Sequence, residues 1–138
     1  MTKAVDDACK EIQSIVAAVA GIQAAPEYPP DKISQFPASI CFAGTGTITK
    51  DSAGSIRGLH QITLELHYQA KNRARAVAYL NPLARLVYRA LMDDDNFNLD
   101  GTIDTIQSID YEFGPLGYDD TPTIGYTFII DVKIIEVL

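Results

Sequence analysis

The first apolar pattern along the chain predicts an amphipathic helix over residues 3–23. Its apolar side chains recur at steps of three and four, at Val5, Ala8, Ile12, Ile15, Val16, Val19 and Ile22. Pro26, Pro29 and Pro30 follow, and because proline lacks a backbone donor and restricts its predecessor, the helix cannot continue through them. We therefore expect a crossing loop over residues 24–37.

A different pattern, with β-branched and alternating residues, predicts two strands joined by a hairpin. The first strand covers residues 39–49, with interruptions at Gly44 and Gly46, and residues 50–55 read as an exposed tip. The second strand covers residues 59–69. One of its faces carries Ile62, Leu64, Leu66 and Tyr68, and the other carries Gln61, Thr63, Glu65 and His67.

Helical spacing returns over residues 72–92. Asn81-Pro82 in the middle has the character of an N-cap followed by a first-turn proline, which predicts a kinked helix or two consecutive helices. A third strand is expected over residues 102–113 and a long turn over 114–122. In the last strand, residues 123–137, one face carries Tyr126, Phe128, Ile130, Val132 and Ile134, and the other carries Thr127, Ile129, Asp131, Lys133 and Ile135.

The order of these elements predicts the fold class. Each strand-to-strand link is short enough for antiparallel pairing. We therefore expect an α+β fold, mainly an antiparallel β-sheet, with the N-terminal helix and the central, kinked or split, helix packed on one face. The second face of the last strand is too apolar for open solvent, which indicates a cover supplied by a neighbour.

Length and charge narrow the class of protein. The chain has 138 residues, too few for separate cofactor and substrate domains, so we expect one domain over residues 1–138. Its net charge of −7 argues against binding nucleic acid through a whole-protein positive field. Its longest apolar run, residues 15–22, is far shorter than the roughly 20 residues that span a bilayer. Acidic residues near the N-terminus do not fit a secretory signal, so we expect a cytoplasmic protein.

The sequence carries no signature of catalysis or metal binding. His60 and His67, the only histidines, point to opposite faces of a strand, and we expect each to be solvated or in an interface. Asp94, Asn96 and Asn98 have the spacing that begins a calcium loop, but Leu99 and Thr105 stand where that loop needs glycine and glutamate. We expect no catalytic residue, no metal and no cofactor. Cys9 and Cys41 are expected to be buried thiols, with a disulfide as the alternative.

Charge is unevenly distributed along the chain. Residues 71–92 carry five bases and no acid, which leaves 6 bases and 18 acids elsewhere, a difference of −12. On a helix, Arg85 and Arg89 lie opposite the apolar face and are therefore exposed. Three interpretations remain open for this stripe: a solvated helix face, a contact with phosphate, or a head-to-tail contact with the acidic face of a neighbour that closes into a ring.

Four stretches of the sequence, together with the order of elements, resemble one family. They are Ile56–Tyr68, Leu99–Asp104, Tyr111–Tyr118 and Gly125–Ile134. The chain resembles the tail-terminator, or tail-completion, proteins of tailed bacteriophages from residue 3 onward. The resemblance lies in the residue patterns of the strands and turns and includes no catalytic motif.

The resemblance implies an α+β sandwich and a homo-oligomeric ring, usually a hexamer. Such a ring would be assembled in the cytoplasm of the bacterial host and would sit in the virion at the head-proximal end of the tail. There it caps the tail-tube protein, stops tube polymerisation and presents a docking surface to the head–tail connector protein. DNA passes through the lumen as cargo, and a negative lumen would not retain it.

Charge and loop length then suggest where the contacts lie. For the subunit interface we predict Lys71, Arg73, Arg75, Arg85, Arg89, Ile129 and Ile135. Contacts with the tail or connector are assigned to a hairpin tip over residues 44–57 and a loop over 114–122, with Thr47, Lys50, Asp51, Arg57, Leu116, Tyr118, Asp119 and Asp120. A head–tail connector or neck protein is the first alternative, and a small α+β ligand-binding module or enzyme is the second.

Overall fold

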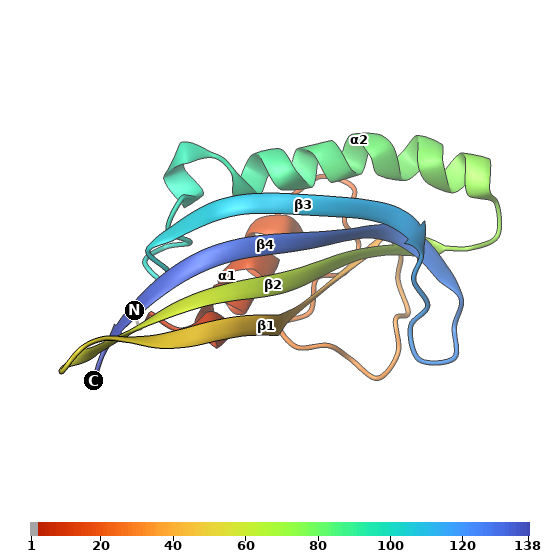
Figure 1. Ribbon diagram of the computed structural model, residues 1–138. Coiled ribbons are helices and arrows are strands. Elements are labelled where there is room, and N and C mark those ends of the chain that lie inside the picture. Colours follow the sequence, from red (N-terminus) through yellow and green to blue (C-terminus); the bar gives the residue numbers. More distant parts are fainter. Residues whose placement is uncertain (1–2) are drawn as a thin grey trace.

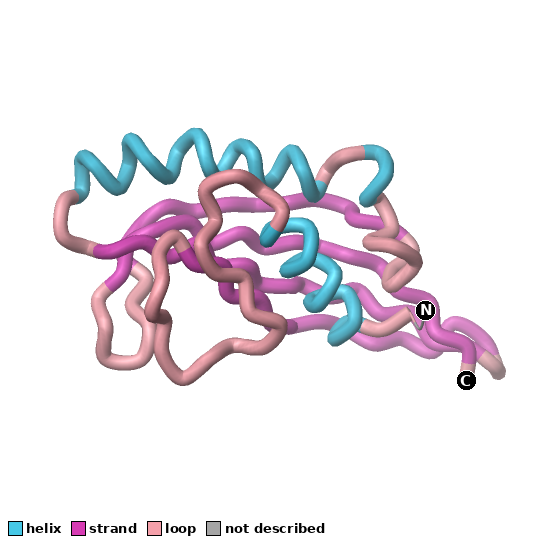
Figure 2. Tube along the Cα trace, turned by 180° about the vertical axis from the view of Figure 1, so that it is seen from behind, coloured by secondary structure: helices cyan, strands magenta, loops and turns pink. Residues whose placement is uncertain are grey.

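The computed structural model describes residues 3–138 and contains two α-helices and a four-stranded antiparallel sheet. The elements are α1 (Val5–Ala17), β1 (Ala38–Ser52), β2 (Ser55–Gln69), α2 (Arg73–Leu91), the 3-10 helix η1 (Asp94–Asn96), β3 (Thr105–Pro115) and β4 (Thr123–Val137). Both helices lie against the same face of the sheet (Figures 1 and 2). The α+β class expected from the element order is confirmed.

The sheet has the strand order β1-β2-β4-β3. Two hairpins, β1–β2 and β3–β4, are joined along their inner strands, and that central pairing runs without a register shift from Ser55 opposite Val137 to Gln69 opposite Thr123. The two strands at its centre are therefore far apart in sequence. The outer strands, β1 and β3, form the edges of the sheet.

Alternate residues of the two central strands form the core. Ile62, Leu64 and Leu66 of β2, and Phe128, Ile130, Val132 and Ile134 of β4, are at most 1% exposed. They meet Ala8, Ile12 and Val16 of α1 and Leu80, Leu83, Val87 and Leu91 of α2 in one cluster. Burying a side chain of this size stabilises the fold by about 1.5–3 kcal/mol. The strand face that the alternation predicts to be apolar is the face on which both helices pack.

Helix α1 is shorter than its apolar pattern predicts, because it ends at Ala17 rather than near residue 23. Gly21 adopts a φ of +103°, a conformation that a helix does not contain and that glycine reaches without strain. A Cβ at Gly21 would lie 3.3 Å from Leu83, so the end of this segment approaches α2 closely. Val19 and Ile22 still pack against the core from the turn that replaces the last helical turns.

Helix α2 is a single helix, and the prediction of an N-cap at Asn81 is wrong. The N-cap is Asn72, whose side chain accepts a hydrogen bond from the Arg75 amide at 3.0 Å. Pro82 lies inside the helix. Because proline has no amide hydrogen, the Ala78 carbonyl lacks the donor that it would have in a regular helix. Ala78 is exposed, so water can donate to this carbonyl instead.

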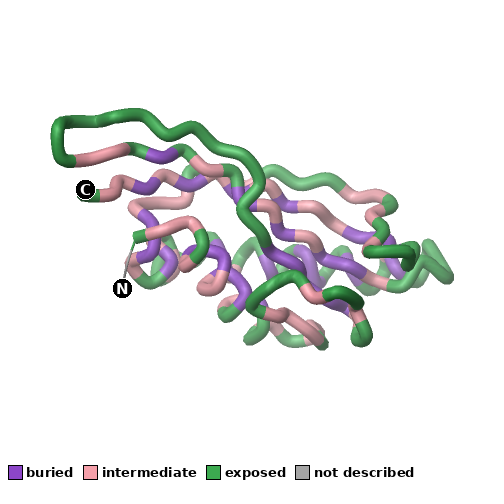
Figure 3. Tube along the Cα trace, turned by 90° about the horizontal axis from the view of Figure 1, so that it is seen from below, coloured by how far each residue is buried: buried purple, intermediate pink, exposed green. Residues whose placement is uncertain are grey.

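The β1–β2 hairpin is longer and more regular than expected. Gly44 falls at a shift of register between Ala43 and Thr45 rather than at a break in the strand. Pairing extends to Ser52 opposite Ser55, so the turn contains only residues 53 and 54 instead of 50–55. We call residues 44–57 the arm. Figure 3 shows an exposed segment along this part of the chain, and every β1 residue from 42 onward is exposed.

The crossing loop after α1 is held against the start of β1. The Gln13 side chain donates to the Pro26 and Ser39 carbonyls, each at 2.7 Å, and accepts from the Ser39 hydroxyl at 2.7 Å. Ala24 forms a bridge with Ala38.

Strand β3 begins at Thr105, three residues later than the sequence pattern predicts. Thr102 and Ile103 are buried in the preceding turn.

Two facing glycines give a stability test. Gly125 and Gly114 are paired on β4 and β3, but a Cβ at Gly125 would lie 1.7 Å from the Leu66 carbonyl oxygen, whereas a Cβ at Gly114 meets nothing within 4 Å. We expect Gly125→Ala to lower the free energy of unfolding by about 3 kcal/mol, because β2 and β4 must separate. Urea denaturation is the measurement. Gly114→Ala is the control and should change the value by less than about 0.5 kcal/mol.

Candidate assembly surfaces

The basic face of α2, here Arg75, Arg85 and Arg89, is exposed, which helical spacing predicts for Arg85 and Arg89. All five basic residues assigned to this region are exposed: Lys71, Arg73, Arg75, Arg85 and Arg89. Within residues 3–138 none of them has an ion-pair partner, whereas Lys3, Lys10 and Arg57 each have one. Arg73 instead lies over the Phe113 ring, 5.9 Å from its centroid. The positive charge of α2 is thus available to another molecule.

A groove with aromatic walls lies between α2 and the edge strand β3. One cavity of about 160 Å³ is lined by Tyr88, Met92, Ile109, Tyr111 and Phe128. An adjoining cavity of about 220 Å³ shares Tyr88, Tyr111 and Phe128 and adds Asn81, Ala84, Arg85 and Tyr126. Tyr111 is 68% exposed, a high value for an aromatic side chain on the helix side of a sheet. Arg85 therefore borders an apolar groove as well as the basic face.

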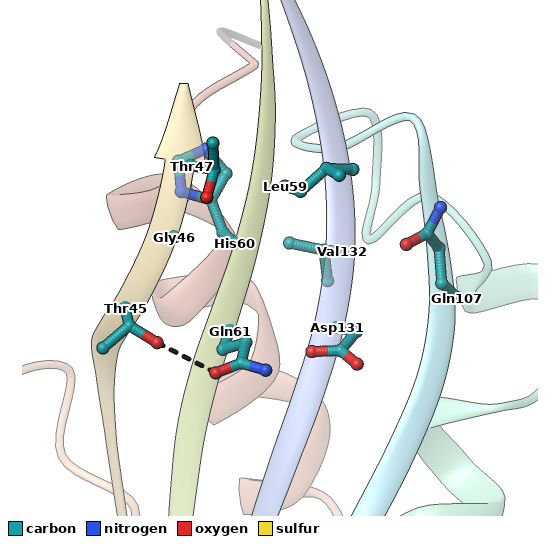
Figure 4. A pocket seen from close by; sticks show the side chains of 9 residues that line it. All are labelled: Thr45, Gly46, Thr47, Leu59, His60, Gln61, Gln107, Asp131 and Val132. Carbon is teal, nitrogen blue, oxygen red and sulfur yellow. Dashed lines mark hydrogen bonds between the residues drawn. The ribbon is translucent and has the colours of Figure 1, made fainter. Parts of the chain in front are cut away.

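The sheet face without helices, here called the open face, has a polar row across all four strands. Thr45 donates to the Gln61 side chain at 2.9 Å, and Ser108 donates to Asp131 at 3.0 Å. Figure 4 shows Thr45, Gln61, Asp131 and Gln107 following one another from β1 to β3, and they line a hollow of about 430 Å³. The second oxygen of Asp131, Oδ1, is buried without a hydrogen-bond partner. Within residues 3–138 this oxygen therefore has neither a protein donor nor access to solvent.

Apolar and acidic residues share the rest of the open face. Ile129 and Ile135, assigned to the interface, are half-buried there, as is Lys133. Leu59 is exposed on the same face, since it pairs with Lys133. The acids Asp110 and Glu112 are exposed on β3. The half-exposed isoleucines fit the expectation that this face is too apolar for open solvent.

The arm and the β3–β4 loop lie at opposite ends of the sheet (Figure 1). Thr47, Lys50, Asp51 and Arg57 are all exposed on the arm. Arg57 and Asp51 form an ion pair at 2.8 Å across the hairpin, so two of these charges are already matched. The residues assigned to contact loops therefore form two separate groups.

The β3–β4 loop is anchored within the chain. The Tyr118 hydroxyl donates to the Pro30 carbonyl, and its backbone exchanges hydrogen bonds with Thr121. Burial, followed by the nearby Asp31, Glu65 and Asp119 carboxylates, raises the Tyr118 pKa. Leu116 is half-buried, whereas Asp119 and Asp120 are exposed. Of the four residues assigned to contacts in this loop, only Asp119 and Asp120 are exposed.

The expectation that His67 is solvated or in an interface is wrong. Its side chain is 0% exposed, with Nδ1 bonded to the Thr123 hydroxyl at 2.7 Å and Nε2 to Glu65 at 2.9 Å. The Tyr118 ring covers it edge-on at 5.5 Å. Loops that are remote in sequence fold over this end of the open face, so strand alternation alone does not reveal the burial.

Cys9 and Cys41 are free and buried, which confirms the expectation of buried thiols. The Cys41 thiol donates to Cys9. This hydrogen bond holds the pKa of Cys9 below its ordinary value and, together with burial, raises that of Cys41. The two side chains join α1 to β1, so we assign them to the core.

The acidic run after α2 has a local structural role. Asp93 accepts a hydrogen bond from the Asp95 amide at 3.0 Å, and Asn96 donates to the Ala90 carbonyl at 2.8 Å. In the part of the chain that the structure describes, no group of three or more His, Cys, Asp or Glu side chains is placed to hold a metal ion. Neither of the two described α-helices is long and apolar enough to cross a membrane.

Comparison with known proteins adds no relative: no family model matches the chain, and no curated protein matches it. The inference of function therefore depends on the surfaces described above and on the resemblance noted in the sequence.

Asp104 links three parts of the chain and gives a pH test. Its carboxylate accepts from Lys3 at 2.7 Å and from the Ile135 amide at 2.5 Å. Burial acts to raise its pKa, but these two donors outweigh burial and the pKa lies below its ordinary value of 3.8. Its stabilising contribution is therefore complete above that value and is lost as the pH falls past it.

We expect Asp104→Asn to lower the free energy of unfolding by about 1 kcal/mol at pH 7. The difference from the parent should persist to about pH 5 and shrink below about pH 4. Urea denaturation across this range is the measurement. Asp120→Asn, which removes an exposed carboxylate, is the control; a constant deficit for Asp104→Asn down to pH 3 would contradict the assignment.

Proposed function

We propose that this protein is a structural subunit of a bacteriophage virion, a tail terminator that assembles head to tail into a ring. The observation that carries the proposal is the exposed basic face of α2, which has no ion-pair partner within residues 3–138. The resemblance of the sequence to tail-terminator proteins supports the same conclusion. The ring would cap the tail tube, stop its polymerisation and receive the head connector.

The charge distribution suits a contact between two different surfaces. All charged residues between positions 71 and 92 are basic, and the rest of the chain has a net charge of −12. Such a molecule attracts a second copy through unlike faces rather than through the same face twice. A row of copies joined in this way has one free surface at each end. The row closes into a ring when the rotation between neighbouring copies lets the last copy contact the first.

The two ends of the sheet give the ring two distinct sides. The tip of the arm, at residues 53 and 54, lies at one end, and the β3–β4 loop with Asp119 and Asp120 lies at the other. A terminator needs one side for the tube and another for the connector, and this arrangement supports that requirement. The overall acidity suits a lumen through which DNA passes without being retained.

Two other functions are tested by the same preparations. A head–tail connector or neck protein would share the ring, and incubation with purified tail tubes and with portal assemblies distinguishes them: the terminator binds the tube end. A ligand-binding module is favoured by one observation, the hollow of about 430 Å³ lined by polar side chains that include Thr45, Gln61 and Gln107. A monomer that binds a small molecule in this hollow would replace the ring proposal.

Charge reversal tests the ring contact. We expect Arg85→Glu with Arg89→Glu to break the oligomer, because four units of charge change on the face that meets an acidic neighbour. Multi-angle light scattering, with the protein at high concentration and low salt, measures the mass. The expected result is a monomer where the parent gives a ring.

The matched control places the same charge change elsewhere. Ala53→Glu with Gly54→Asp, Gln69→Glu and Thr121→Glu changes four exposed residues at the two ends of the sheet, away from the acids that α2 would meet, by the same total charge and should leave the ring intact. If the Arg85 and Arg89 variant keeps the mass of the parent, the ionic contact is wrong.

A further inference from the structure

Both edges of the sheet offer unpaired backbone over similar lengths. On β1, the Ser39 amide is bonded to the Ala24 carbonyl, so the open part of the edge begins near residue 41 and runs to 52. On β3, the Ile106 amide is bonded to the Phe97 carbonyl, which leaves residues 107–115. Nine residues of strand extend about 30 Å. Long open edges of this kind readily pair with another chain.

The number of strands determines how two copies can join. In an antiparallel sheet of four strands, β1 and β3 run in opposite directions at opposite edges. A second copy in the same orientation therefore brings its β1 antiparallel to β3 of the first. We propose that, in the ring of the proposed function on which this inference rests, β1 of each copy pairs with β3 of the next, so that the sheet continues across every subunit boundary.

Full overlap of the two open edges restricts the register. If residues 107–115 all pair within residues 41–52, Asp110 lies opposite a residue between 46 and 49. Thr47 and Thr49 are the members of that range on the open face, because they pair with Leu59 and Arg57. Asp110 pairs with Ile129 and belongs to the same face. The register therefore places a threonine hydroxyl, a donor, beside an exposed carboxylate.

The helix side of the same register is apolar. Ile48 is 54% exposed and pairs with Gly58, which puts it on the face that carries the helices. With Asp110 opposite Thr47 or Thr49, Ile48 lies opposite Ile109 or Tyr111. Both of those residues line the groove beside α2. The neighbouring strand would thus cover a groove that the single copy leaves open, which removes apolar surface from water.

Charge favours this pairing over a two-fold dimer through β3. Two β3 edges placed together would bring Asp110 and Glu112 of one copy against the same acids of the other, and like charges across strands are destabilising. The open face of β1 from 42 to 49 carries no acid.

The positions of the helices favour the same pairing, because α1 contacts β1 and α2 contacts β4. Continuing the sheet brings Arg85 and Arg89 towards the α1 side of the next copy, where Asp6, Glu27 and Asp31 are exposed.

Cysteine cross-linking tests the pairing. Two double variants, Thr47→Cys with Asp110→Cys and Thr49→Cys with Asp110→Cys, place exposed thiols on the two edges. Side chains directly opposite in antiparallel strands are close enough for a disulfide or a short bis-maleimide bridge. We expect at least one variant to give a ladder of covalent oligomers on denaturing gels, longer than a dimer, and the disulfide ladder to collapse to monomer with reductant.

Three controls make the result specific. Single-cysteine variants should give dimer at most, because each copy then has one new thiol. Ser14→Cys with Asp110→Cys should give no ladder, since Ser14 is exposed on α1, on the other side of the sheet. The native Cys9 and Cys41 are buried and remain in all variants.

Light scattering on the reduced variants separates failure of this inference from failure of the ring. A ring mass without a ladder in either double variant overturns the β1–β3 pairing and leaves the ring standing. Efficient dimers from the Thr47→Cys single variant would show a two-fold β1–β1 contact and overturn it as well. A monomer mass with no cross-link overturns both the ring and the pairing.

Discussion

The pairing between β2 and β4 is the interaction on which the rest of the molecule depends. It joins two hairpins that are separated by α2, and its register continues unbroken from Ser55 opposite Val137 to Gln69 opposite Thr123. Because side chains alternate between faces, a slip of one strand by one residue would turn either the buried Ile62 or its partner Ile130 to the open face. Both helices depend on this register, since they pack on the apolar face that it creates.

Much of the fold is visible in the sequence because alternation is a local signal. Strand β4 begins and ends where the pattern predicts, at Thr123 and Val137, and its buried face is the predicted one. The differences arise where tertiary contacts override local preference. Gly44 is accommodated by a register shift instead of ending β1. Pro82 is accepted inside α2 because the backbone that it disrupts faces water.

The candidate surfaces could be predicted only in part. Exposure of Arg85 and Arg89 follows from helix geometry, which needs no knowledge of the rest of the fold. The row from Thr45 to Ser108 depends on the register of four strands, and the burial of His67 depends on Tyr118 and Thr123, which follow it by about fifty residues. Contacts of that kind are set by topology, and no single stretch of sequence contains them.

The uneven cover of the sheet has a consequence for its dynamics. Strands β1 and β2 belong to the core at one end and, in the arm, to a hairpin whose β1 side chains are all exposed. The amide hydrogens along β1 should therefore exchange with solvent at very different rates, slowly near the buried Cys41 and faster towards the tip. The β1 side of the arm can fray and re-form while β2 stays paired with β4, which would let β1 search for a partner strand while the core remains closed.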